Sequence, residues 1–246
     1  MDFEKVEYYD NLEMAYISNL SGGFISKNTH IFNEIELNHL NKFILEKAVY
    51  GTPIFKLGTG GKRILILSGI HGNELPSQIA NIRIFNELVN KDIDNTIFFI
   101  PFAAPKATMQ NSRFFNALDL NRAAHIENSL SNVIVKRIVG LGIDFVGDFH
   151  STAFNSNPGI EAIFSTKSPT PESFLMAAHI ARDVRCGLIS FDSAGESYKG
   201  AVEDVCNMRG IPAITGEVLS PFSSVGKGSV ERAMFQMKSF LAYFGI

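Results

Sequence analysis

Apolar runs of strand length alternate with helical apolar spacing along most of this chain, and that alternation most limits its fold. Strand-like runs are expected at 43–45, 53–57, 63–67, 96–102, 144–150, 160–165, 188–191 and 213–218. Helical spacing is expected at 76–89, 132–139 and 171–184, in a segment that ends near 208, and at 230–244. Strands separated by helices build parallel sheets, so the sequence predicts an α/β fold. We expect a mixed, mainly parallel sheet with helices on both faces.

The length and composition predict a single domain. The chain has 246 residues, of which 46% are hydrophobic and 19% are charged, so it can bury one full core. No low-complexity linker or internal repeat divides it. We therefore expect one domain over 1–246, with 1–40 as an N-terminal extension for which the pattern predicts no definite structure.

Charge, hydropathy and cysteine content argue against several classes of partner. The net charge is −3 and no basic run exists, so nucleic acid is not an expected partner. No apolar run approaches the ~20 residues that cross a bilayer, and the first residues lack the pattern of a secretory signal. Cys186 and Cys206 are the only cysteines, too few for a disulfide framework. We expect reduced thiols and a cytoplasmic location, while the oligomeric state stays open.

Three residues with metal-binding side chains stand at the ends of two strand-like runs. His71 and Glu74 follow the run at 63–67, and His150 ends the run at 144–150. A His-x-x-Glu pair occurs often by chance, but ligands of open parallel sheets bind at the carboxyl ends of strands. Two imidazoles and one carboxylate leave the fourth position of a zinc ion free, as in catalytic sites. The pattern predicts one catalytic Zn²⁺ per chain.

Four ordered motifs extend this pattern over about 53–222. They are His71-Gly72-Asn73-Glu74, the run Asp119-Leu120-Asn121-Arg122, Asp148-Phe149-His150, and Gly216-Glu217. In this combination the chain resembles the zinc carboxypeptidase superfamily, specifically its succinylglutamate desuccinylase and aspartoacylase branch. The resemblance implies a single-domain zinc-carboxypeptidase-like fold.

The resemblance also implies a role for each matching residue. It assigns zinc to His71, Glu74 and His150, and the role of general base to Glu217. It assigns a carboxylate clamp to Asn121 with Arg122, and a mobile substrate-binding side chain to Tyr198. The group that polarises the scissile carbonyl would be Arg113. The carboxylate that orients a zinc-bound imidazole would be Asp119, with Asp148 as its competitor.

The chain departs from the branch in two ways. Arg113 lies nine positions before Arg122, whereas the branch usually has eight. Only 29 residues follow Glu217, too few for the carboxyl-terminal β domain of that branch, and small murein-peptide amidases of the superfamily lack that domain as well.

The predicted function is a zinc-dependent hydrolase that cleaves an amide bond next to a free carboxylate. The expected substrate is an N-acyl amino acid or a short peptide. Two alternatives keep the chemistry: a metallocarboxypeptidase, or an amidase acting on murein or γ-glutamyl peptides. An alternative of another class is a catalytically silent metal-binding domain.

Overall fold

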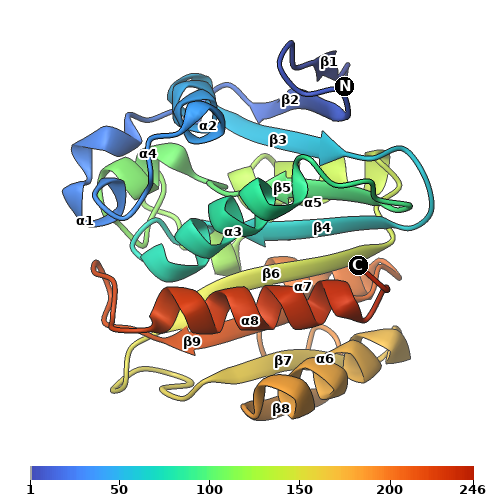
Figure 1. Ribbon diagram of the computed structural model, residues 1–246. Coiled ribbons are helices and arrows are strands. Elements are labelled where there is room, and N and C mark those ends of the chain that lie inside the picture. The colour runs from blue at the N-terminus through green and yellow to red at the C-terminus, as the bar shows by residue number, and fades with distance from the viewer. Residues whose placement is uncertain (1) are drawn as a thin grey trace.

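One large mixed sheet forms the centre of the protein. The computed structural model describes residues 2–246, and its strands have the order β1-β2-β3-β5-β4-β6-β9-β7-β8 (Figure 1). The strands are β1 (Glu4–Lys5), β2 (Leu12–Ser18), β3 (Thr52–Leu57), β4 (Arg63–Ser68), β5 (Thr96–Ile100), β6 (Phe145–Thr152), β7 (Ala162–Ser168), β8 (Gly187–Ser193) and β9 (Ala213–Leu219).

The middle of the sheet is parallel and both flanks include antiparallel pairs. β5, β4, β6 and β9 run in the same direction. On one side β3 pairs antiparallel with β5, and on the other β7 pairs antiparallel with β9. This arrangement confirms the predicted mixed, mainly parallel sheet.

Helices cover both faces of the sheet. They are α1 (Thr29–Phe32), α2 (His39–Tyr50), α3 (Leu75–Leu88), α4 (Pro105–Met109), α5 (Leu130–Gly140), α6 (Pro171–Val184), α7 (Val202–Met208) and α8 (Ser229–Ala242), with 3₁₀ turns η1 (Ile25–Lys27) and η2 (Leu120–Arg122). The apolar side chains of α2, α3, α6 and α8 join one core cluster, and those of α4, α5 and α7 join a second. In Figure 1, α3 and α8 lie side by side in front of the sheet.

The predicted strand at 43–45 is wrong, because these residues lie within α2. Asn38 caps this helix through its side chain, which accepts a hydrogen bond from the backbone N–H of Asn41. Leu40, Ile44 and Ala48 then recur every four residues on one buried helical face. A three-residue apolar run cannot distinguish a strand from one turn of helix, and here the cap and the longer periodicity decide.

Other differences are smaller. The strand expected at 160–165 begins and ends later, as β7, and the expected loop before Arg122 contains α4 and η2. Within 2–40, for which no structure was expected, β2 adds to the sheet by antiparallel pairing with β3. Among residues 2–246, no helix combines the length and the apolar character that a membrane span requires.

Candidate metal centre and adjoining cavity

The parallel strands bring predicted site residues together at their carboxyl ends. His71 follows the end of β4, while His150 and Glu217 are directly paired positions on the neighbouring strands β6 and β9. Side chains alternate along a strand, so Asp148 and His150 project from the same face of β6. The topology therefore brings together, at the carboxyl ends of the parallel strands, residues that are widely separated in sequence.

Gly72 lets the loop between β4 and α3 pass close to α4. A Cβ atom at this position would lie 2.1 Å from the carbonyl carbon of Ala107 and 2.3 Å from the backbone nitrogen of Thr108. Contacts this short between a side chain and backbone do not occur in real structures. A glycine between the two candidate ligands of this loop is therefore required by space.

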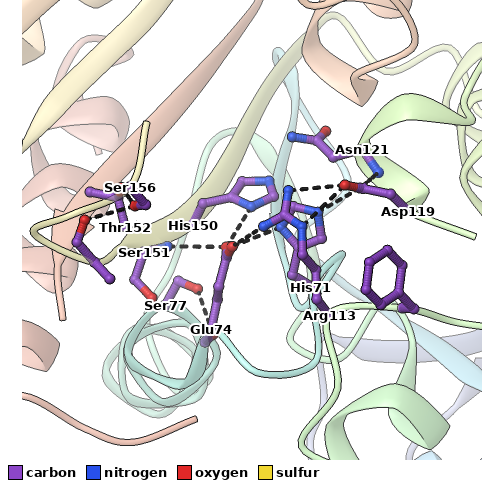
Figure 2. A network of polar contacts seen from close by, with 12 residues as sticks. His71, Glu74, Ser77, Arg113, Asp119, Asn121, His150, Ser151, Thr152 and Ser156 are labelled. Carbon is purple, nitrogen blue, oxygen red and sulfur yellow. Dashed lines mark hydrogen bonds and ion pairs between the residues drawn. The ribbon is translucent and has the colours of Figure 1, made fainter. Parts of the chain in front are cut away.

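The side chain of Glu74 lies between two buried imidazoles (Figure 2). His71 Nδ1 lies 2.8 Å from Glu74 Oε1, and His150 Nδ1 lies 2.8 Å from Oε2. The exposed fractions of these three residues are only 2–3%. One ligand atom from each lies within 4.8 Å of the other two, so the group could hold a metal ion.

Each imidazole contacts a second carboxylate through its other ring nitrogen. His71 Nε2 lies 2.9 Å from Asp119 Oδ1. His150 Nε2 lies 3.1 Å from Asp148 Oδ2, although this contact lacks the alignment of a hydrogen bond. In metal sites such carboxylates fix the orientation of the ring and raise its basicity. Both imidazoles consequently present Nδ1 toward Glu74.

The helix α3 begins directly after this group. Glu74 occupies its N-cap position with φ −101° and ψ 80°, and the Glu74 side chain accepts no hydrogen bond from the first turn. Its oxygens instead accept hydrogen bonds from the Ser151 backbone N–H at 3.2 Å and from Arg113 Nη1 at 3.2 Å. The carboxylate is thus directed into the site and away from the helix.

Arg113 connects the two carboxylates on the His71 side. Besides its bond to Glu74, it donates through Nε to Asp119 Oδ2 at 3.1 Å, and its Nη2 lies 3.0 Å from the same oxygen. The irregular segment that contains Arg113 precedes η2, where Asp119 also accepts a hydrogen bond from the Asn121 backbone N–H. Arg113 is therefore held beside the candidate ligands.

The local charges shift the pKa values of this network in opposite directions. Burial alone would raise the pKa of Glu74, but the His71 and His150 imidazoles outweigh it and hold that pKa well below its usual range. For His150, burial would lower the pKa, but Asp148 and Glu74 outweigh it and raise that pKa well above its ordinary value. Mutual charge stabilisation thus dominates over desolvation here.

Glu217 stands apart from these pairs. Its Oε2 atom is buried and has no hydrogen-bond partner among residues 2–246. Burial and the neighbouring Glu74 carboxylate raise the pKa of Glu217 to about 8. An unpartnered carboxyl group at the strand position paired with His150 is available to exchange a proton with a ligand.

One cavity brings together most of the other predicted residues. His71, Glu74, Arg113, Asn121, Arg122, Tyr198 and Glu217 all line it. The space between the atoms of this cavity is about 530 Å³ when its open mouth is included. His150, Asp119 and Asp148 are not in the lining. His150 contacts Glu74 and Asp119 contacts His71, both of which line the cavity, while Asp148 contacts His150.

Arg122 and Tyr198 touch each other in this cavity. The guanidinium carbon of Arg122 lies 5.1 Å from the centre of the Tyr198 ring, a cation–π contact. The Tyr198 ring also packs against Phe164, and its hydroxyl donates to Asn157 Oδ1 at 3.4 Å. Arg122 donates its own Nη1–H to the Asn121 carbonyl at 2.7 Å.

Several lining residues were not singled out by sequence reasoning. Ser151 and Thr152 follow His150 on β6, and Thr215 lies two residues before Glu217 on the same face of β9. Continuing the strand pattern from the motif residues could have found these three. Glu203 also lines the cavity, but it lies in α7, for which no motif gave a signal.

The donor set fits a catalytic zinc ion. Two imidazole nitrogens and one carboxylate are among the ligand sets of such sites, and both imidazoles have the outer carboxylate contacts that accompany metal ligation. The group also stands at the carboxyl ends of parallel strands, beside a cavity that a ligand can enter. Asp119 and Asp148 both supply such an outer contact, one on each imidazole.

Solved structures with the same fold come from related classes of protein. The succinylglutamate desuccinylase/aspartoacylase from Rhodobacter sphaeroides is 17% identical with a TM-score of 0.62, over 81% of this chain and 61% of its own. A metallo-carboxypeptidase from Burkholderia cenocepacia is 12% identical with a TM-score of 0.62, over 97% of this chain and 66% of its own. Carboxypeptidase A from Helicoverpa armigera is 12% identical with a TM-score of 0.59, over 85% and 72%. The fold is therefore carboxypeptidase-like, as expected.

The sequence matches the model of a protein family, although a comparison with individual curated proteins found no match. The chain spans less than two thirds of the length of the Rhodobacter protein. The succinylglutamate desuccinylase/aspartoacylase catalytic domain, however, matches residues 60–218, which is more than half of the chain. The chain therefore belongs to the succinylglutamate desuccinylase/aspartoacylase family.

Proposed function

We propose that this protein is a zinc-dependent hydrolase that cleaves an amide bond next to a free carboxylate. Deacylation of an N-acyl amino acid is the reaction that the site supports best. The observation that carries this proposal is one cavity lined by two of the three possible metal ligands, His71 and Glu74, by the carboxyl group of Glu217 and by two arginines. Family membership supports the same class of reaction.

The residues divide the chemistry between them. His71, Glu74 and His150 would hold the zinc ion, which supplies a Lewis acid and lowers the pKa of water bound to it. Glu217 would accept a proton and return it to the leaving amine. Arg122 with Asn121 would bind the substrate carboxylate, for which the planar guanidinium suits two parallel hydrogen bonds.

Arg113 would act on the scissile carbonyl. A fixed positive charge beside a developing oxyanion is a strong source of catalysis. Its bonds to Glu74 and Asp119 hold the guanidinium in position beside the candidate ligands. Tyr198 would hold the Arg122 side chain in position, because the two side chains are stacked. It would also contact the substrate.

Metal content and turnover together test this proposal. Purified wild-type protein should contain about one zinc per chain by plasma mass spectrometry, and His71→Ala and His150→Ala should both lose it. Glu217→Gln should keep the metal but lower turnover of N-acyl amino acids by roughly 10²–10⁴-fold, the usual contribution of a general base.

Each result has a distinct meaning. Wild-type protein that neither contains zinc nor takes it up would remove the metal hydrolase proposal. Unchanged turnover in Glu217→Gln would remove Glu217 from the mechanism. Metal without turnover on N-acetyl, N-succinyl and peptide substrates would favour a silent metal-binding domain.

A metallocarboxypeptidase or peptide amidase is the second candidate. The match to the Burkholderia metallo-carboxypeptidase covers 97% of this chain, more than the 81% covered by the Rhodobacter protein. Comparison of kcat/KM for N-acyl amino acids with that for dipeptides and γ-glutamyl peptides separates the two candidates.

A further inference from the structure

Glu203 has a buried carboxyl group in the cavity, and the proposed reaction assigns no role to this residue. It lies in the first turn of α7, is only 5% exposed, and lines the same cavity as Arg122 and Glu217. Its Oε1 accepts a hydrogen bond from the Asn207 side chain. No hydrogen bond to its Oε2 is present in the described part of the chain. One carboxyl oxygen is therefore left for a ligand in the cavity.

No cation among residues 2–246 forms an ion pair with the Glu203 carboxyl group. The two arginines of the cavity are engaged elsewhere, Arg113 with Glu74 and Asp119, and Arg122 with the Tyr198 ring. Burial, with the nearby Asp204 and Asp148 carboxylates, raises the pKa of Glu203 to about 8. Without a partner this carboxyl group is therefore mostly protonated at neutral pH, and a cation bound beside it would stabilise its charged form.

The position of Glu203 relative to Arg122 is set by one short segment. Tyr198 stacks on Arg122, and the Gly200 carbonyl accepts a hydrogen bond from the Ala124 backbone N–H at 2.9 Å. Ala201 and Glu203 continue this segment along the wall of the cavity. One cationic side chain, Arg122, and one acidic side chain, Glu203, therefore line the same cavity.

A buried carboxyl group is costly unless it is paired, and a ligand can supply the partner. An amino acid with a cationic side chain carries both groups that this wall would bind. Its α-carboxylate suits Arg122, and an ammonium or guanidinium group suits Glu203. A neutral side chain would leave Glu203 unpaired, and an acidic one would add a further negative charge.

We propose that the cavity selects substrates whose amino acid portion ends in an ammonium or guanidinium group, which Glu203 binds. This inference rests on the proposed function and adds the class of substrate to it. Glu203 would be a specificity-determining residue, and Thr215, which lines the same cavity, would contact the aliphatic part of the side chain.

The test compares substrates that differ in charge and little in shape. The kcat/KM values of N-acetyl-L-lysine, N-acetyl-L-arginine, N-acetyl-L-norleucine and N-acetyl-L-glutamate are measured with zinc-loaded wild-type protein, and again with the corresponding N-succinyl compounds. The lysine or arginine compound should exceed norleucine by roughly 30-fold or more, as expected for a buried charge pair. Equal or better turnover of norleucine or glutamate would overturn the proposal.

Variants assign the preference to one side chain. Glu203→Gln keeps the shape and a hydrogen-bond acceptor for Asn207, so the ratio of lysine to norleucine should fall to within a few-fold of one. Glu196→Gln removes the same charge from an exposed position on the loop before α7, and should keep the wild-type ratio. An unchanged ratio in Glu203→Gln would contradict the assignment.

Binding separates failure of this inference from failure of the proposed function. If no compound is hydrolysed, the proposed function fails, but calorimetry with L-lysine and L-norleucine on the same wild-type protein still tests the cavity. Tighter binding of L-lysine, lost in Glu203→Gln, supports the inference. Equal binding of both amino acids overturns it, and this result does not depend on turnover or on the folding of a variant.

Discussion

At the scale of single residues, Asp119 connects the candidate metal ligands to the arginine beside them. One of its oxygens contacts His71, and the other accepts from Arg113, so one side chain orients two functional groups. Burial would raise the pKa of Asp119, but the bonds from His71 and Arg113 outweigh it and hold that pKa well below its usual range. Asp119 is therefore expected to be charged at neutral pH.

We predict that Asp119→Asn lowers zinc affinity by about 10–100-fold, the usual effect of losing such an outer carboxylate. Affinity is measured by competition with a chelator of known strength. Asp148→Asn is the matched comparison, because Asp148 contacts His150 and not Arg113. Arg113 should lose its position in the first variant only, so turnover per bound zinc should fall further in Asp119→Asn. Equal turnover per zinc in both variants would contradict this role.

At the scale of elements, the loop between β4 and α3 depends on its close approach to α4. Gly72→Ala should lower the free energy of unfolding by about 1–3 kcal/mol, the typical cost of overpacking, because its Cβ would meet the backbone of Ala107. Urea denaturation monitored by circular dichroism measures this change.

The control for this variant is Gly140→Ala, in the last turn of α5. A Cβ there meets no atom within 4 Å, so the variant should be neutral or stabilising by up to about 1 kcal/mol. If both variants behaved alike, close packing at Gly72 would not be the cause.

Elements also explain what the sequence could predict. The proximity of His71 and His150 was predictable because neighbouring parallel strands end on the same side of the sheet, and because their motifs are local. The helix at His39–Tyr50 was missed because three apolar residues fit either periodicity. Glu203 gave no signal because its importance comes from the cavity that α7 forms with distant strands, and no local pattern records that arrangement.

At the scale of the whole molecule, the N-terminal residues and the candidate site share one sheet. β2 pairs with β3, and β3 pairs with β5 beside the strand that carries His71. The core cluster on the α3 face includes Leu12 and Met14 from β2 together with Phe240 from α8. The two ends of the chain therefore contribute to the same core.

We expect the chain to unfold as one domain. Far-ultraviolet circular dichroism and tyrosine fluorescence should give the same midpoint in urea, because no boundary divides the sheet. Removal of bound zinc by a chelator should shift both midpoints together to lower urea. Two separate transitions would instead identify residues 1–40 as an independently unfolding extension.

The start of α3 shows how the demands of a site and of a helix can differ. Serine, threonine, aspartate and asparagine are the favoured N-cap residues, and a good cap contributes about 1 kcal/mol. This helix has Glu74 there, with its side chain directed to His71 and His150. A laboratory selection for heat resistance alone would favour a shorter capping side chain at this position. It would thereby select against the one carboxylate that, within residues 2–246, reaches both imidazoles, so thermostable variants of this protein should be sought elsewhere in the chain.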